Sequence, residues 1–137
     1  MHVRVRTASK GRIVLLAAIL GVASGCAAPD GRQAPGDPLL APYVVTAREL
    51  VDEMLRLAEV GKEDVLYDLG SGDGRIVIAA ARLYGTRGIG SELDPELVRR
   101  STENARQAGV SHLVTFREQD VMTTDFSGAS VVTIYLS

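Results

Sequence analysis

The sequence predicts an α/β domain, in which helices cover an open parallel sheet and four strands are present. Short apolar segments of strand length alternate with longer segments whose apolar residues recur at helical spacing, a pattern typical of parallel sheets. A glycine-rich turn joins the first predicted strand to the helix after it. The 137 residues are 46% hydrophobic and 23% charged, which fits one globular domain or part of one.

We place the domain at residues 43–137. Its first helix begins at a capping box, because Thr46 and Glu49 can each accept a hydrogen bond from the other's backbone N–H, and it ends at Gly61. The elements predicted next are a buried strand at 64–69, a glycine-rich turn at 70–74, a helix at 76–84 and a strand at 87–92.

The second half of the domain continues the alternation. Asp94 followed by Pro95 marks a helix start, since proline at the first helical position loses no hydrogen bond, and this helix extends to about Ala108. Two further strands are predicted at 113–117 and 130–136. The connection between them is long enough for a crossover with at most a short helix.

Residues 1–26 are predicted to be a targeting leader. Basic residues precede an apolar run at 13–23, which has the length of a signal-peptide core and is short for a membrane span. Ala23-Ser24-Gly25-Cys26 resembles a bacterial lipobox, which would make Cys26 the lipidated residue of an exported or membrane-associated protein. The alternatives are an ordinary secretory signal, an inner-membrane anchor, or an incorrect start codon, which would leave the protein cytoplasmic. Residues 27–42, rich in proline and glycine, are predicted to be a flexible linker.

Charge and cysteine content exclude several classes of function. The first 25 residues hold four basic side chains and no acidic one. The other 112 residues therefore hold 11 of the 15 basic and all 17 acidic side chains, a net charge of −6. An acidic surface is a poor match for a phosphate backbone, so we expect no nucleic-acid partner. One cysteine excludes an intrachain disulfide and a multi-cysteine zinc site, and no metal site is predicted.

The glycine-rich turn carries the chemistry of the domain. The segment Asp68-Leu69-Gly70-Ser71-Gly72-Asp73-Gly74 ends the first strand and begins a helix, where parallel sheets bind ligands. Glu92 ends the second strand, 24 residues after Asp68, where a carboxylate commonly accepts from two ribose hydroxyls. This spacing predicts a cofactor that contains ribose.

The acidic residues of the turn favour one such cofactor. A dinucleotide-binding turn would have a third glycine at the position of Arg75 and no acid beside the pyrophosphate. Here Asp68 and Asp73 flank the turn, and both would repel a phosphate. S-adenosylmethionine has no phosphate, and its ammonium and sulfonium groups suit carboxylates. We therefore favour S-adenosylmethionine over a nicotinamide dinucleotide and a methyltransferase over an oxidoreductase.

The sequence resembles a class I S-adenosylmethionine-dependent methyltransferase, with a Rossmann-like fold, from about Pro42 to Ser137. Residues 67–81, YDLGSGDGRIVIAAA, with Pro42-Tyr43-Val44 and Gly90-Ser91-Glu92-Leu93-Asp94-Pro95, resemble a narrower group. These are small protein-lysine methyltransferases related to the mitochondrial enzymes that act on the ATP synthase c-subunit and on the adenine nucleotide translocase. One departure is Val45, where that group often has proline.

The resemblance implies roles for individual residues. Asp68, Gly70 and Gly72, with Ser71 between them, would hold the methionine end of the cofactor. Glu92 would take the ribose hydroxyls, Leu93 would pack on adenine, and Asp120 would accept from the adenine amino group. No catalytic residue is assigned, and protein lysine as the methyl acceptor follows from the resemblance alone.

A complete sheet of this class has more than the four strands that the sequence predicts. We therefore expect the domain to be truncated at its C-terminal end, to expose its fourth strand as an apolar edge, and to have poor turnover. The alternative is a non-catalytic exported lipoprotein that keeps the fold as a binding module.

Overall fold

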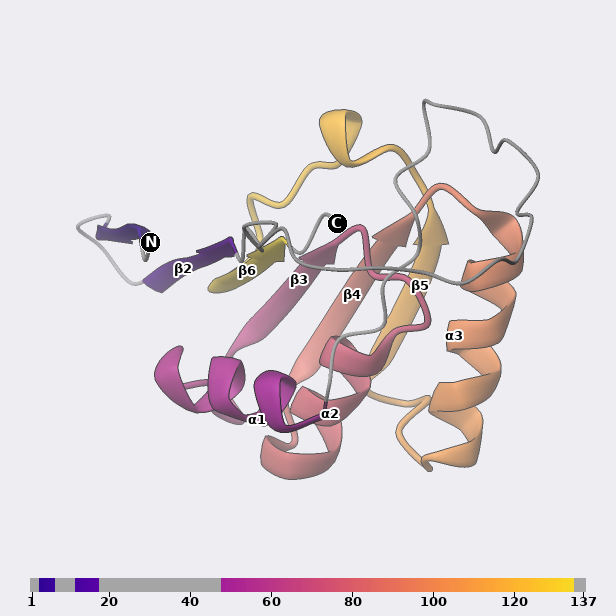
Figure 1. Cartoon of the computed structure of the whole chain (residues 1–137), viewed down its shortest axis with the longest axis horizontal. Coiled ribbons are helices and arrows are strands. Elements are labelled where there is room, and N and C mark those ends of the chain that lie inside the picture. Colours follow the sequence, from indigo (N-terminus) through magenta and orange to yellow (C-terminus); the bar gives the residue numbers. More distant parts are fainter. Residues whose placement is uncertain (1–2, 7–11, 18–47, 135–137) are drawn as a thin grey trace, which may run out of the picture.

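The computed structural model describes residues 3–6, 12–17 and 48–134, which form a sheet with three α-helices on one of its faces (Figure 1). In chain order the elements are β1 (Val3–Arg6), β2 (Arg12–Ala17), α1 (Arg48–Leu57), β3 (Val65–Leu69), α2 (Arg75–Tyr84), β4 (Arg87–Glu92), α3 (Pro95–Gln107), β5 (Val114–Glu118), a short 3-10 helix η1 (Val121–Thr123) and β6 (Val131–Ile134). Within the described part, no helix is both long and apolar enough to span a membrane.

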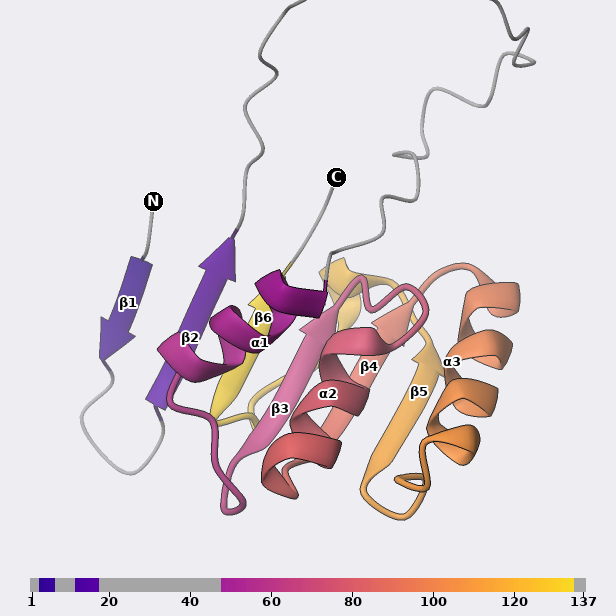
Figure 2. The same cartoon turned by 60° about the horizontal axis from the view of Figure 1, so that its bottom comes forward.

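The four predicted strands are confirmed as a parallel sheet in the order β6-β3-β4-β5. Helices α2 and α3 connect β3 to β4 and β4 to β5, and α1, α2 and α3 lie on the same face of the sheet (Figure 2). The predicted bounds that fall within the described residues agree with the structure to within one or two residues, except that α1 ends at Leu57 rather than at Gly61.

The expectation that the fourth predicted strand forms an open edge is wrong. Strand β2 pairs in parallel with β6, with Leu15 opposite Val132 and Ala17 opposite Ile134, and β1 pairs antiparallel with β2. The physical reason is that β6 offers a row of backbone hydrogen-bonding groups, and the residues of β2, RIVLLA, have the composition of a buried strand.

Several sequence predictions lie outside the described residues. They are the lipidation of Cys26, the linker at 27–42, the entry segment at 42–45, the capping hydroxyl of Thr46, and the end of the last strand at 135–136. The role of residues 1–26 as a targeting leader stays a prediction.

The main core lies between the helices and one face of the sheet. Val51, Met54 and Leu55 of α1 and Val77 of α2 pack with Leu66 of β3 in one buried cluster. A smaller cluster on the other face contains Leu69, Val132 and Ala129. The start of α3 agrees with the prediction: Asp94 caps the helix by accepting from the N–H of Glu96 at 2.8 Å, and Pro95 lies in the first turn.

Candidate cofactor-binding site

Four residues, one from each of the predicted strands, form a row across the sheet at its carboxyl end. Asp68 of β3 lies opposite Thr133 of β6 on one side and opposite Gly90 of β4 on the other, and Gly90 lies opposite Phe116 of β5. Paired residues of neighbouring strands point to the same face. Because Asp68 is two residues after Leu66, this row faces the helices.

The glycine-rich loop lies directly on this row. Gly70 and Gly72 have positive φ angles of 79° and 55°, which a side chain would strain, and the N–H groups of Gly70 and Ser71 both donate to the carbonyl of Ser91 at 2.9 Å. A Cβ at Gly90 would come within 2.6 Å of the Oγ of Ser71. The absence of a side chain at Gly90 therefore allows the loop to approach β4.

Asp68 is the most unusual residue of the site. Asp68 is 1% exposed, its Oδ1 accepts from the hydroxyl of Thr133 at 2.6 Å, and its Oδ2 has no hydrogen-bond partner among the residues that the structure describes. Burial raises the pKa of Asp68 to about 7; the Thr133 hydrogen bond opposes this rise, and the negative charge of Glu92 adds to it. The Oγ of Ser71 is also buried and has no hydrogen-bond partner within residues 48–134 or the two described N-terminal strands.

Glu92 lies beside the loop, as the sequence predicted, at the end of β4. Its Oε2 accepts from the N–H of Gly72 at 2.8 Å, and its Oε1 accepts from the N–H groups of Leu93 at 2.9 Å and Asp94 at 3.1 Å. No pattern in the sequence indicated these bonds to the backbone. A carboxylate has about four lone-pair sites and three are occupied here, so Glu92 keeps capacity for about one ribose hydroxyl, and its role with the ribose stays a prediction.

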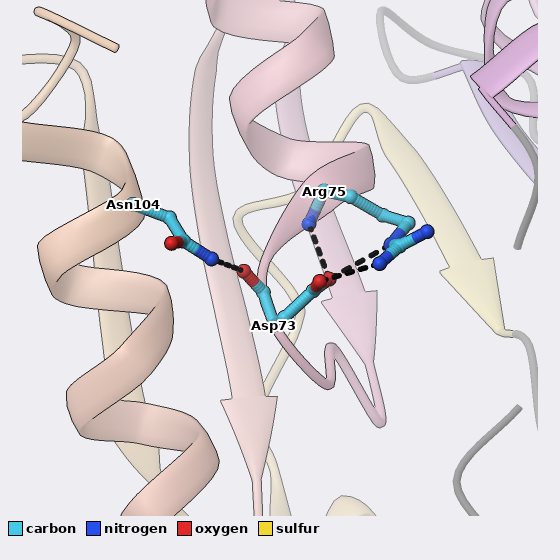
Figure 3. A network of polar contacts seen from close by, with 3 residues as sticks. All are labelled: Asp73, Arg75 and Asn104. Atoms are coloured by element: carbon cyan, nitrogen blue, oxygen red, sulfur yellow. Dashed lines mark hydrogen bonds and ion pairs between the residues drawn. The ribbon is translucent and has the colours of Figure 1, made fainter. Parts of the chain in front are cut away.

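Asp73 does not add a free negative charge to the loop, which corrects the expectation that both acids of the turn would repel a phosphate. Its carboxylate pairs with the guanidinium of Arg75 at 2.5 and 2.8 Å (Figure 3). The side chain of Asn104 on α3 donates to the Asp73 carbonyl at 3.0 Å. The loop is thus fixed to the start of α2 and to α3, and sequence reasoning missed both contacts. The acidic character of the site rests on Asp68 and Glu92.

Two exposed apolar side chains follow the carboxyl ends of neighbouring strands. Leu93, after β4, is 55% exposed, and Met122, after β5, is 86% exposed. Asp120 precedes Met122 and uses its Oδ1 to cap η1 by accepting from the Met122 N–H at 2.8 Å. The strand ends are joined by the bond from the N–H of Gln119 to the carbonyl of Glu92 at 2.9 Å. Contacts of Leu93 and Asp120 with adenine stay predictions, and Met122 was not predicted.

These residues fit the predicted cofactor. A buried carboxylate oxygen without a partner is costly, so it suits a ligand that brings N–H donors and a positive charge. The Asp68 Oδ2 and the Ser71 Oγ, under a loop with little side-chain bulk, match the amino-acid end of S-adenosylmethionine. No group of three or more metal-ligating side chains occurs in the part of the chain that the structure describes.

The fold and the site define a class of protein, the Rossmann-like S-adenosylmethionine-dependent methyltransferases. A solved structure of this class, an RNA methyltransferase from Salinibacter ruber in complex with S-adenosyl-L-homocysteine, is 57% identical and superimposes with a TM-score of 0.68. The match covers 69% of this chain and 61% of that one. Within the class, the chain belongs to the family defined by the ANTKMT methyltransferase domain, whose sequence profile matches residues 68–137.

Curated relatives place the family more narrowly. A protein-lysine N-methyltransferase from Saccharolobus islandicus is 38% identical over 96 residues, which cover 69% of this chain and 60% of the relative. The lysine N-methyltransferase of the ATP synthase c-subunit from Xenopus laevis is 37% identical over 120 residues, which cover 88% of this chain and 50% of the relative. The chain therefore spans between half and about three fifths of the length of these curated relatives.

Proposed function

We propose that this chain is the cofactor-binding part of a methyltransferase whose acceptor is a protein lysine. The observation that carries the proposal is the buried Oδ2 of Asp68, which has no hydrogen-bond partner in the described part of the chain and lies beneath a glycine-rich loop, with Glu92 on the neighbouring strand β4. The relatives named as lysine methyltransferases, one of proteins and one of the ATP synthase c-subunit, support the lysine acceptor.

Different residues of the chain would bind different parts of the cofactor. Asp68 and the loop would hold the amino-acid end of S-adenosylmethionine, Glu92 the ribose, and Leu93 one face of the adenine. When bound, the cofactor supplies a methyl group made electrophilic by the sulfonium. Transfer of this methyl group is a displacement whose rate depends mainly on alignment of the reacting groups and on exclusion of water. A loop held in place by its contacts would therefore contribute to the rate. A lysine acceptor must also lose its proton, and we assign no residue to that step.

RNA is the second candidate acceptor. The observation in its favour is the 57% identity with the structure described as an RNA methyltransferase. The net charge of −6 on residues 26–137 opposes binding to a phosphate backbone, so we favour protein.

Two measurements on the full chain test the proposal. The first is calorimetric titration with S-adenosyl-L-homocysteine, with NAD as the control ligand; we expect binding of the first and none of the second. The second is transfer of a labelled methyl group to a cell extract, followed by separate treatment with protease and with nuclease. Label released by protease supports a protein acceptor, label released by nuclease supports RNA, and failure to bind S-adenosyl-L-homocysteine would contradict the function altogether.

We further propose that the mature protein is membrane-associated through lipidation of Cys26, as the lipobox-like segment suggests. Cleavage before Cys26 would remove β1 and β2, so the pairing of β2 with β6 would belong to the uncleaved chain. Mass spectrometry of the N-terminal peptide and fractionation of the Cys26→Ser variant test this. A lipidated chain that binds S-adenosyl-L-homocysteine and transfers no methyl group would instead support the alternative, an exported binding module.

A further inference from the structure

We propose that Thr133 is a positioning residue of the cofactor site: its hydroxyl fixes the Asp68 carboxylate through Oδ1 and so leaves Oδ2 available to the cofactor's ammonium group. This inference rests on the proposed function, because it assumes that Asp68 receives that ammonium group. It assigns a binding role to β6, a strand for which the sequence predicts none.

Among the described residues, one hydrogen bond holds the Asp68 side chain in place. Thr133 is buried on β6 directly opposite Asp68, and its Oγ lies 2.6 Å from Oδ1. The same hydroxyl lies 3.4 Å from the carbonyl of Tyr67, so its one proton forms the stronger bond with Asp68. On the other side the strand partner is Gly90, which has no side chain. Within the described residues, Thr133 is thus the hydrogen-bond partner of the Asp68 side chain.

A threonine suits this task for two reasons. Its β-branched side chain is stiff about χ1, so the hydroxyl stays where the strand places it. A neutral donor also stabilises the ionised carboxylate without competing with a cationic ligand for charge. A lysine or arginine at this position would neutralise Asp68 itself.

The hydrogen bond also affects the charge state of Asp68. Burial and the negative charge of Glu92 raise the pKa of Asp68, and the Thr133 hydroxyl lowers it. Two further charged groups of the described loop region, Asp73 and Arg75, pair with each other, and β6 has no titratable side chain between Val131 and Ile134. Loss of the hydroxyl would therefore raise the pKa further, so that less of Asp68 is ionised near neutral pH.

The test is calorimetric titration of the full chain with S-adenosyl-L-homocysteine between pH 5.5 and 8.5, comparing Thr133→Val, Thr133→Ser and a matched control. Thr133→Val keeps the shape and removes the hydroxyl, whereas Thr133→Ser keeps a donor. The control is Thr86→Val, because Thr86 is also fully buried and donates to a carbonyl, that of Gly61 at 2.9 Å, outside the site.

We expect Thr133→Val to weaken binding about tenfold to a hundredfold at neutral pH, the range for a hydrogen bond to a charged group, and to shift the pH midpoint of binding upward. Thr133→Ser should bind within a few-fold of wild type. Thr86→Val should lower thermal stability and leave the affinity unchanged. Wild-type affinity and an unchanged pH midpoint in Thr133→Val would overturn the inference.

A second measurement separates this inference from the proposed function. Carbon-13 NMR of the Asp68 carboxyl reports its pKa without any cofactor. If the wild-type chain fails to bind S-adenosyl-L-homocysteine, the proposed function fails and the cofactor role of Thr133 fails with it. An upward pKa shift in Thr133→Val would still support its control of Asp68, and an unchanged pKa would overturn that as well.

Discussion

At the scale of single residues, the site is marked by two buried side-chain atoms without hydrogen-bond partners in the described structure. The Oδ2 of Asp68 and the Oγ of Ser71 are buried and have no hydrogen-bond partner in the described structure. Such atoms are rare in folded proteins because each loses its contacts with water and gains nothing in exchange. Their position under the glycine-rich loop is explained by a ligand that supplies the missing partners.

The first prediction concerns the charge of Asp68. Asp68→Asn keeps the shape of the side chain and removes the negative charge, so we expect S-adenosyl-L-homocysteine to bind on the order of a hundredfold more weakly, the cost of leaving a charged group without its partner. Calorimetric titration measures this. Asp64→Asn is the matched control, because Asp64 accepts from Gly61 N–H and Ser130 at the other end of β3 and should affect stability alone. Equal weakening by both variants would contradict a specific role for Asp68.

The second prediction concerns stability against pH. The pKa of Asp68 is raised to about 7 in the folded chain, above its unfolded value near 4, so the folded state binds more protons in between. Protonation of Asp68 therefore contributes fully to the free energy of unfolding below about pH 4, and this contribution is lost as pH rises through about 7. The total loss is at most about 4 kcal/mol. Urea unfolding of wild type and Asp68→Asn at several pH values should give curves that diverge, with the variant gaining relative stability as pH rises. Parallel curves would show that Asp68 does not titrate in this window.

The residues that sequence reasoning placed correctly are those with local signals. Asp68 and Glu92 each end an apolar strand, and the glycine pattern marks the loop between β3 and α2. Thr133 carries no such signal, because its contact with Asp68 depends on the register of strands 65 residues apart. The charge of Asp73 was misjudged for a related reason: its neutralisation by Arg75 depends on how the loop turns.

At the scale of elements, close packing between the loop and the sheet positions the site. Gly90 of β4 lies under Ser71, and its absent side chain leaves room for both the loop and Phe116 of β5. The strands and helices themselves were predictable, because apolar runs of strand length alternate with amphipathic segments that begin and end at recognisable caps. The close contact at Gly90 was not predictable, since it joins elements that are not adjacent in sequence.

The third prediction follows from that contact. A Cβ at Gly90 would lie 2.6 Å from both Ser71 Oγ and Phe116 Cδ1, so Gly90→Ala should destabilise the fold by about 1–3 kcal/mol and displace the loop, with loss of S-adenosyl-L-homocysteine binding. Gly128→Ala is the matched control, because nothing lies within 4 Å of a Cβ there. Chemical unfolding and titration measure the two effects. A Gly90→Ala variant as stable as Gly128→Ala would contradict the packing described here.

The fourth prediction concerns the link between the loop and α3. Asn104→Ala removes the hydrogen bond to the Asp73 carbonyl and should cost about 1 kcal/mol in stability and several-fold in S-adenosyl-L-homocysteine affinity, because the loop loses a support. Gln107→Ala, on the same helix, removes a contact with Glu103 at the exposed surface and should change neither. The idea fails if affinity responds equally to both substitutions.

At the scale of the whole molecule, the described sheet has helices on one face and a partner strand on the edge that the sequence left open. The apolar run that predicts a signal-peptide core also satisfies the pattern of a buried strand, and hydrophobic periodicity alone does not separate the two. The sequence therefore indicated the four-stranded parallel sheet but not the addition of β1 and β2.

The fifth prediction tests that edge. Removal of residues 1–26 takes away β2, so hydrogen exchange at the backbone of 131–134 should accelerate by about tenfold or more, while β3 and β4, which have neighbours on both sides, keep their protection. The shortened chain should also aggregate more readily, because β6 becomes an open edge. Hydrogen-exchange mass spectrometry and light scattering measure these changes. Unchanged exchange in β6 would show that β2 does not cover it in solution.

The pairing of Asp68 with Thr133 also bears on the order in which parts of the site form during folding. Strands β3, β4 and β5 each pair with the strand that precedes or follows them in sequence, whereas β6 must return across 65 residues to reach β3. Contacts this distant in sequence form late, because a large loop must close before they gain anything. As the chain emerges during synthesis, the glycine-rich loop can thus form well before its carboxylate is held in place. Affinity for the cofactor is then gained only when β6 docks against β3.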